Sequence, residues 1–213
     1  MALLDTVVVG PLETNCYLFG DSATRQCAII DPGGDLDLIA DAIEQEDLRP
    51  EMILLTHAHF DHTGAVEGLK RRYGLRVGSS QAEARCLGDQ RLSGAAWFGV
   101  PFEPSMADFF IADGDEIRVG SAKLRALATP GHSSGGLSFV GDGLVFVGDV
   151  LFREGVGRYD LPGSDFDELC QSLGRLLDLD DKTVVYPGHG PATTIGHERR
   201  HNPFLTDLPP RRK

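Results

Sequence analysis

Short apolar runs recur along the chain, and most have the length of a β-strand rather than of a helix. They lie at Thr6–Val9, Cys16–Phe19, Ala28–Ile30, Met52–Leu55, Ala122–Leu127, Leu137–Val140, Leu144–Val147 and Thr183–Tyr186. Gly-Asp-Gly at 141–143 separates two of these runs, and its Asp-Gly step is typical of a tight hairpin. The longer runs are too apolar to have a solvated face, so we expect these strands to be buried on both sides.

Three further stretches carry apolar residues at helical spacing. These residues are Leu36, Ile39, Ala40 and Ile43 in the first stretch, Ala65, Leu69 and Tyr73 in the second, and Phe166, Leu169, Cys170, Leu173, Leu176 and Leu177 in the third. Asp35 is the expected N-cap of the first helix. Ser164 and Asp167 predict a capping box at the start of the last helix. The pattern therefore predicts three amphipathic helices among the strands.

Strands and helices are mixed along the sequence, which predicts a layered α/β fold with helices outside and sheets inside. We expect a single domain over residues 1–208, followed by a frayed basic tail at 209–213. The stretch Leu92–Phe110 has no regular period and gathers several aromatic residues. Two interpretations of this stretch stay open: a lid or wall of a pocket, and plain core packing beneath a loop.

Composition narrows the class of partner. The 213 residues carry a formal net charge of −12, which argues against general binding to nucleic acid or to an anionic membrane. No apolar run approaches the ~20 residues of a membrane span. The N-terminus lacks the pattern of a targeting signal, and the four cysteines form no C-x-x-C pair. We therefore expect reduced thiols in a cytoplasmic protein.

Histidine is the residue type with the most unusual placement. THAHFDH, residues 56–62, puts three of the seven histidines directly after the apolar run Met52–Leu55. Three other apolar runs end in a similar way, at Pro130-Gly131-His132, at Gly148-Asp149 and at Pro187-Gly188-His189. Rigid strands that deliver side chains from loops to one edge of a sheet can build a precise site. Imidazole and carboxylate groups at these points indicate a site for zinc, iron or manganese.

The spacing within the first motif divides its residues between two directions. In an extended segment, residues i and i+2 point the same way, so His57 and His59 can bind one ion. Asp61 and His62 begin the next turn and point elsewhere, towards a second ion. With the residues at the other strand ends, the candidate ligands number seven, whereas one zinc ion takes about four ligands including water. We therefore predict two ions that share one carboxylate.

These motifs resemble those of the metallo-β-lactamase superfamily, and most closely its compact glyoxalase II-like branch. H-x-H-x-D-H at 57–62, the later His132, the Gly-Asp pair with Asp149 and the Gly-His pair with His189 carry the resemblance. It implies a four-layered αβ/βα sandwich with a dinuclear site at the edge of the two sheets. The implied ligands are His57, His59 and His132 for the first metal, Asp61, His62 and His189 for the second, and Asp149 as the bridge.

The resemblance also implies a reaction. Two divalent ions, with zinc expected first and iron or manganese as alternatives, lower the pKa of a bound water and provide a hydroxide nucleophile. The implied substrate is a thioester, S-D-lactoylglutathione or a related S-acylglutathione. Asp61 and Asp149 would be the catalytic carboxylates, and Arg158 and Tyr159 would contact the substrate. Only residues 191–213 follow the last ligand, where the longer glyoxalase II enzymes have a helical domain that binds glutathione.

Other functions can use the same motifs. An iron-dependent persulfide dioxygenase, acting on glutathione persulfide, would hold one iron through His57, His132 and Asp149. A binding scaffold that keeps only the fold would be expected to have lost ligands, and all seven are present. A nuclease is disfavoured by the acidic balance, and a periplasmic lactamase by the expected cytoplasmic location.

Several polar residues have a structural interpretation beside the functional one. Arg158 could form an ion pair with Asp160 or Asp165 that shapes its loop, instead of or in addition to binding substrate. His197 and His201 stand four residues apart, which would suit a metal on a helix, but no third candidate ligand is near them in sequence. We interpret them as helix-surface or tail-packing residues.

Overall fold

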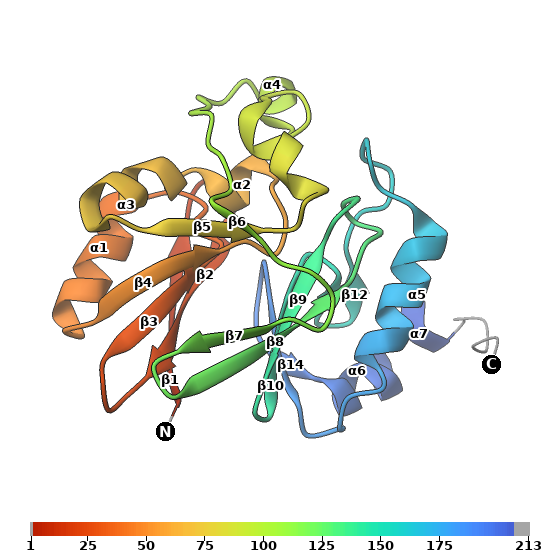
Figure 1. Ribbon diagram of the computed structural model, residues 1–213. Coiled ribbons are helices and arrows are strands. Elements are labelled where there is room, and N and C mark those ends of the chain that lie inside the picture. Colours follow the sequence, from red (N-terminus) through yellow and green to blue (C-terminus); the bar gives the residue numbers. More distant parts are fainter. Residues whose placement is uncertain (1, 207–213) are drawn as a thin grey trace.

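The computed structural model describes residues 2–206, which form two main sheets with helices on their outer sides (Figure 1). The first sheet has the order β1-β2-β3-β4-β5-β6. Its strands are β1 (Ala2–Val9), β2 (Thr14–Asp21), β3 (Gln26–Ile30), β4 (Arg49–Leu54), β5 (Arg76–Ser79) and β6 (Phe109–Phe110). β1 to β3 pair antiparallel, whereas β3 to β6 pair parallel, so β3, β4 and β5 end at the same edge.

The second sheet has the order β14-β13-β10-β9-β8-β7. Its strands are β7 (Glu116–Val119), β8 (Ala122–Ala128), β9 (Leu137–Gly141), β10 (Leu144–Gly148), β13 (Val184–Pro187) and β14 (Thr193–Thr194). β10 and β13 run parallel, and the other pairs are antiparallel. The predicted hairpin is confirmed, because β9 and β10 pair across a turn in which Gly143 has a φ of +71°. A small third sheet pairs β11 (Leu151–Phe152) with β12 (Gly155–Val156).

Helices cover the outer face of each main sheet, which gives the four layers predicted from the resemblance. α1 (Leu36–Gln45) and α3 (Val66–Tyr73) pack on the first sheet, and α5 (Phe166–Leu176) and α6 (Ile195–His201) on the second (Figure 1). The shorter helices are α2 (Phe60–Thr63), α4 (Ala95–Phe98), α7 (Pro203–Thr206) and the 3₁₀ helix η1 (Glu83–Gly88). Buried aromatic side chains from both sheets, including Phe19, Phe139 and Phe146, fill the space between them.

Of the two predicted helix caps, Asp35 stands at the N-cap position of α1 as predicted but makes no side-chain cap bond, and the Ser164 capping box at α5 is wrong. Asp35 precedes α1, but its backbone is left-handed (φ 44°) and its carboxylate accepts the backbone N–H of Gly10 at 2.8 Å instead of capping the helix. At α5 the N-cap is Asp165, which accepts the N–H of Glu168 at 2.9 Å, while the Ser164 hydroxyl donates to a backbone carbonyl. At α5 the neighbouring residues Ser164 and Asp165 compete for the capping role, whereas at α1 a tertiary contact takes the carboxylate away from the helix.

The remaining sequence expectations have mixed outcomes. The helix predicted after His62 exists as α3, with the short α2 before it; between the two, the N–H of Ala65 donates to the carbonyl oxygen of Pro32 at 2.9 Å instead of to a helical carbonyl. The four cysteines are free thiols, as predicted. Within residues 2–206, no helix has both the length and the apolar character that a bilayer crossing requires. The predicted tail 209–213 lies outside the described residues.

Candidate metal centre at the sheet edge

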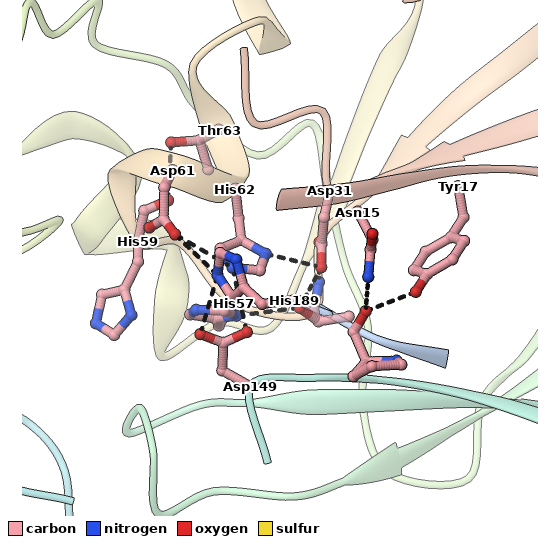
Figure 2. A network of polar contacts seen from close by, with 12 residues as sticks. Asn15, Tyr17, Asp31, His57, His59, Asp61, His62, Thr63, Asp149 and His189 are labelled. Carbon is pink, nitrogen blue, oxygen red and sulfur yellow. Dashed lines mark hydrogen bonds and ion pairs between the residues drawn. The ribbon is translucent and has the colours of Figure 1, made fainter. Parts of the chain in front are cut away.

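All seven predicted ligands come together at one edge of the sheets, although they follow four different strands (Figure 2). After β4 come His57, His59, Asp61 and His62, the last two on α2; after β8, β10 and β13 come His132, Asp149 and His189. The backbone N–H of Leu137 donates to the carbonyl oxygen of Thr56 at 2.8 Å and joins the two sheets next to the site. The predicted meeting of strand ends is therefore present.

The first group consists of His57, His59 and His132, whose ligand atoms lie within 4.8 Å of one another. Nδ1 of His59 lies 3.0 Å from Nε2 of His132. Nδ1 of His132 donates to the carbonyl oxygen of Arg158 at 2.9 Å, so its Nε2 carries a lone pair when the ring is neutral. Two ring nitrogens this close are stabilised by a proton or a cation between them.

The second group consists of Asp61, His62 and His189. Oδ2 of Asp61 lies 3.2 Å from Nε2 of His189 and 3.6 Å from Nε2 of His62. Nδ1 of His189 donates to the carbonyl oxygen of Leu12 at 2.9 Å, which again leaves Nε2 free for the site. Asp61 and His62 gather around His189, whereas His57 and His59 gather around His132; His62 also lies beside His57, with ring centroids 4.1 Å apart, in a third candidate group with Asp31.

Asp149 lies between the two groups. Its Oδ1 is 3.4 Å from Nε2 of His62, and its Oδ2 is 3.7 Å from Nε2 of His132 and 3.5 Å from Nε2 of His189. In Figure 2 its carboxylate points at the imidazoles from the side opposite α2. One carboxylate therefore faces ligands of both groups, which is the geometry of a bridging ligand.

Asp31 is a buried carboxylate that orients two of the histidines, and the sequence reasoning missed it. Its Oδ1 accepts the N–H of Thr56 at 2.7 Å, and its Oδ2 accepts the Thr56 hydroxyl at 2.5 Å and Nδ1–H of His62 at 3.1 Å. The Thr56 oxygen lies 3.0 Å from Nδ1 of His57. Both rings therefore direct Nε2 into the site. The available signal was Asp31-Pro32-Gly33, which follows a strand that ends at the same edge as β4.

Glu83 is a second buried carboxylate that the sequence reasoning missed. Its side chain is almost fully buried at the start of η1. One oxygen accepts the N–H of Ala58 at 2.9 Å, between the ligands His57 and His59, and the other accepts the N–H of Gly135 at 2.7 Å, just after His132. Glu83 therefore ties together the two loops that carry the first group. An acidic residue in an irregular segment gives no sequence signal for this role.

The loop that carries His189 is held by side chains from β2 (Figure 2). Asn15 donates to the carbonyl oxygens of Pro187 at 3.0 Å and of Gly190 at 2.9 Å. The hydroxyl of Tyr17 donates to the same Pro187 oxygen at 2.6 Å. The first sheet thus fixes a ligand that belongs to the second sheet.

Burial and mutual proximity set the protonation of the site. Burial holds the pKa of His57 well below its usual value, and burial together with His132 lowers the pKa of His59 to about 4. Burial opposes the charges of Asp149 and His62, but their mutual attraction outweighs it, so the pKa of Asp149 is lowered and that of His62 is raised. His57 and His59 therefore offer neutral imidazoles, and the second group surrounds a position that favours positive charge. These are the conditions that metal coordination needs.

Unpartnered atoms at the centre fit a pair of cations. Three atoms there are buried and have no hydrogen-bond partner in the part of the chain that the structure describes: Nε2 of His57, Nε2 of His62 and Oδ1 of Asp149. Unpaired buried polar atoms are costly, so a ligand is expected to satisfy them. Gly188 keeps this space open, because a Cβ there would collide with Oδ1 of Asp149. The residues present therefore fit the two divalent ions that the sequence predicts.

A cleft of about 310 Å³ opens directly over the site. Its floor includes His59, Asp61, His132, Asp149 and His189. One wall is formed by Phe60 and by the first part of the irregular segment, namely Leu92, Ser93, Gly94, Trp97 and Phe98. The other wall is formed by Phe152, Val156, Arg158, Leu161 and Pro162. Of the two interpretations of Leu92–Phe110, the wall of a pocket is therefore confirmed for its first part.

Comparison with known proteins identifies the family. The model of the metallo-beta-lactamase superfamily matches residues 9–189, which span every candidate ligand. The chain belongs to the metallo-β-lactamase superfamily. Members of this superfamily bind divalent metals, and this chain has clustered His and Asp side chains that could hold them.

Relatives within the superfamily cover almost the whole chain. The chain is 42% identical over 202 residues to a probable metallo-hydrolase, YqgX, of Bacillus subtilis, covering 92% of this chain and 94% of the relative. It is 36% identical over 207 residues to the hydroxyacylglutathione hydrolase GloC of Haemophilus influenzae, covering 95% and 97%. These relatives are consistent with a glyoxalase II-like branch.

Solved structures of the superfamily have the same fold. The B3 metallo-beta-lactamase BLEG-1 superimposes with a TM-score of 0.92 at 37% identity, covering 96% of this chain and 100% of that one. A di-iron-bound form of TTHA1623 gives 0.86 at 40% identity, covering 94% and 100%. ETHE1 from Myxococcus xanthus gives 0.79 at 33% identity, covering 95% and 84%. The predicted metallo-β-lactamase fold is confirmed.

Of the two predicted substrate contacts, only Arg158 lines the cleft, and His197 lies outside the candidate metal groups of the described residues. Arg158 lines the cleft, but its guanidinium forms two hydrogen bonds with Asp160, at 2.8 and 3.0 Å. Tyr159 stacks on Phe166 with ring centroids 4.6 Å apart, and the lining of the cleft does not include it. Its role as a substrate contact stays a prediction. His197 on α6 pairs with Glu154 and belongs to none of the candidate metal groups among residues 2–206.

Proposed function

We propose that this metallo-hydrolase superfamily member cleaves a thioester, namely S-D-lactoylglutathione or a related S-acylglutathione. The observation that carries the proposal is the assembly of two ligand groups around Asp149, which faces His62, His132 and His189 at 3.4–3.7 Å. We propose zinc as the first metal to test, with iron and manganese as alternatives that accept the same ligands. The four free thiols support action in a reducing compartment such as the cytoplasm.

The residues divide the work of hydrolysis between them. When bound, two divalent ions supply Lewis-acid activation of a water molecule and of the thioester carbonyl. Asp149 would orient both groups of ligands. Asp61 stays ionised at neutral pH because, although burial opposes its charge, His62 lowers its pKa, so it can hold its neighbour His189 in place. Both carboxylates thus act by fixing charge and orientation.

The bond changes in this reaction balance without an additional nucleophile. The oxygen of water forms a bond to the carbonyl carbon, the carbon–sulfur bond breaks, and its electron pair leaves with sulfur as a thiolate. The products are a carboxylate and a thiol. Because a thiolate is a good leaving group, no Ser or Cys nucleophile is required, and Cys16 and Cys27 are buried in the core.

The carrier half of the substrate is proposed to lie near Arg158. This guanidinium lies on the cleft wall and can exchange its exposed partner Asp160 for a carboxylate of glutathione. The similarity to the hydroxyacylglutathione hydrolase GloC supports this carrier.

A second candidate is an iron-dependent persulfide dioxygenase that acts on glutathione persulfide. It would use one iron held by His57, His132 and Asp149, and Nε2 of His132 lies 3.7 Å from Oδ2 of Asp149. The similarity to ETHE1 favours this candidate as well. The hydrolase stays preferred because the second group, with Asp61 and His189 at 3.2 Å, is equally well assembled.

The test is thiol release from S-D-lactoylglutathione by metal-replete protein, with Asp149→Ala as the inactive control. The proposal expects rapid release that falls at least a hundredfold in the variant, because loss of the bridging carboxylate affects both groups. No release from folded, metal-loaded protein would exclude this substrate. Oxygen consumption with glutathione persulfide would then distinguish the second candidate.

A further inference from the structure

The wall of the cleft next to α2 is apolar and exposed. Trp97 and Phe98 on α4 are each 55% exposed, which is unusual for aromatic side chains beside a polar centre. Phe98 packs on Phe60 with ring centroids 5.0 Å apart, and Phe60 directly precedes the candidate ligand Asp61. We refer to Phe60, Trp97 and Phe98 as the aromatic wall. It places apolar surface against the metal groups.

The opposite wall differs in charge. Within residues 2–206, Arg158 is the one Lys or Arg that lines the cleft, and its guanidinium can bind a carboxylate. The aromatic wall contributes no charged group. A charged or peptide-like part of a substrate would lose hydration without compensation on the aromatic wall, whereas an apolar part would gain by covering it. The cleft therefore has one side suited to each half of an asymmetric thioester.

We propose that the aromatic wall binds the acyl half of the substrate and makes apolar acyl groups, both alkyl and aryl, better substrates than the small polar lactoyl group. This inference rests on the proposed thioester hydrolysis and names the substrate class within it. The carbonyl carbon must lie over the two ligand groups, so the halves extend in opposite directions. The charged carrier extends towards Arg158, and the acyl group extends towards Phe60 and Phe98.

The assignment has a consequence for acyl chain length. The cleft of about 310 Å³ is at the lower end of the range for sites that enclose small ligands and is shared by both halves, so a longer acyl group has to extend over the aromatic wall. Each methylene that leaves water contributes up to a roughly fourfold gain in binding. Within a series of acyl groups, kcat/KM should therefore rise with chain length until the aromatic wall is covered.

The experiment compares S-acetyl-, S-butanoyl-, S-hexanoyl-, S-phenylacetyl- and S-D-lactoylglutathione. We expect kcat/KM of the wild type to rise about two- to fourfold per methylene buried, and to be higher for phenylacetyl than for lactoyl. In Trp97→Ala and Phe98→Ala this dependence should flatten, mainly through KM, because the hexanoyl and phenylacetyl substrates lose more apolar contact than the lactoyl substrate does. Phe110→Ala removes an equally exposed ring outside the cleft and should leave the series unchanged.

Phe98→Leu is a conservative companion variant that keeps apolar area and should retain part of the dependence on chain length. Metal content is measured for every variant, so that a lost ion is not mistaken for a lost contact. A wild type that cleaves all members equally, or a slope that survives in the Trp97→Ala/Phe98→Ala double variant, would overturn the inference and leave the proposed hydrolysis intact.

Binding gives a readout that does not depend on hydrolysis. Trp97 is the single tryptophan of the chain, so its fluorescence reports on the wall alone. Hexanoate and phenylacetate should change the emission of the metal-loaded protein in a saturable way, and lactate should change it much less. If no acylglutathione is cleaved but Trp97 responds in this order, the apolar site stands and the proposed function is wrong. If Trp97 does not distinguish these acids, the inference is wrong.

Discussion

Replacing Glu83 by Gln removes a charge from the buried carboxylate that ties two ligand loops together. Its two oxygens accept N–H groups of Ala58 and Gly135 at 2.9 and 2.7 Å. The Gln side chain has nearly the same shape but offers one oxygen and one NH₂ group. One backbone N–H then keeps a neutral hydrogen bond, while the other faces a second donor and loses its partner.

The loss of stability expected in Glu83→Gln follows from the two hydrogen bonds that its carboxylate accepts. A hydrogen bond to a charged group contributes about 1.5–3 kcal/mol, and a buried donor without a partner costs about 1–3 kcal/mol. Weakening one bond and losing the other should lower the free energy of unfolding by about 2–4 kcal/mol. The exposed pair of Glu46 with Arg25, at 3.4 Å, provides the control, because Glu46→Gln should cost less than about 0.5 kcal/mol.

The assay is urea unfolding at neutral pH, followed by circular dichroism, for metal-free and metal-loaded protein. Ala58 lies between two ligands of the first group, so Glu83→Gln should also weaken binding of one ion by about tenfold, in the range seen when groups that orient metal ligands are changed. A Glu83→Gln variant as stable as the Glu46→Gln control, with unchanged metal affinity, would refute the argument that Glu83 holds the site together.

Three further predictions test other parts of the account. Gly188→Ala should reduce the affinity for metal at least about tenfold, because the added Cβ collides with Oδ1 of Asp149. Gly155→Ala is the control and should bind metal normally, because its added Cβ meets only a side-chain atom at 3.8 Å. Calorimetric titration of both variants with metal compares them. Hydrogen bonds, led by the one from the N–H of Ala23, lower the pKa of Asp21 from 3.8 to about 2. Asp21 therefore stabilises the fold above pH 4, and this contribution is lost as the pH falls towards 2. Urea unfolding of the metal-free proteins should show that Asp21→Asn loses less stability than the wild type over that range. Chelation should lower the melting temperature and re-addition of zinc should restore it, because the ions bind the folded ligand set.

The candidate site was easier to predict from the sequence than parts of the fold. All seven ligands follow apolar strands, and because those strands end at one edge, residues far apart in sequence such as His62 and His189 lie side by side, with ring centroids 5.3 Å apart. By contrast, β5 and β7 were not predicted, since each has four residues with polar members and no apolar run. Local pattern alone could not detect them.

The residues that support the ligands could not be detected from local sequence pattern either. Asp31 and Glu83 act through backbone and imidazole N–H groups of segments more than twenty residues away. The sequence gives their chemical type but not these long-range partners. A related reason applies to α1: Asp35 is its N-cap residue, as predicted, but the carboxylate accepts the N–H of Gly10 instead of one from its own helix.

The most direct test of the central claim is the number of metal ions bound per chain, measured by elemental analysis after dialysis. The account predicts two ions in the wild type and one tightly held ion in His189→Ala, which removes a ligand of the second group from a partly exposed loop and leaves the first group of His57, His59 and His132 complete. One ion in the wild type, with no change in His189→Ala, would contradict the two-ion site.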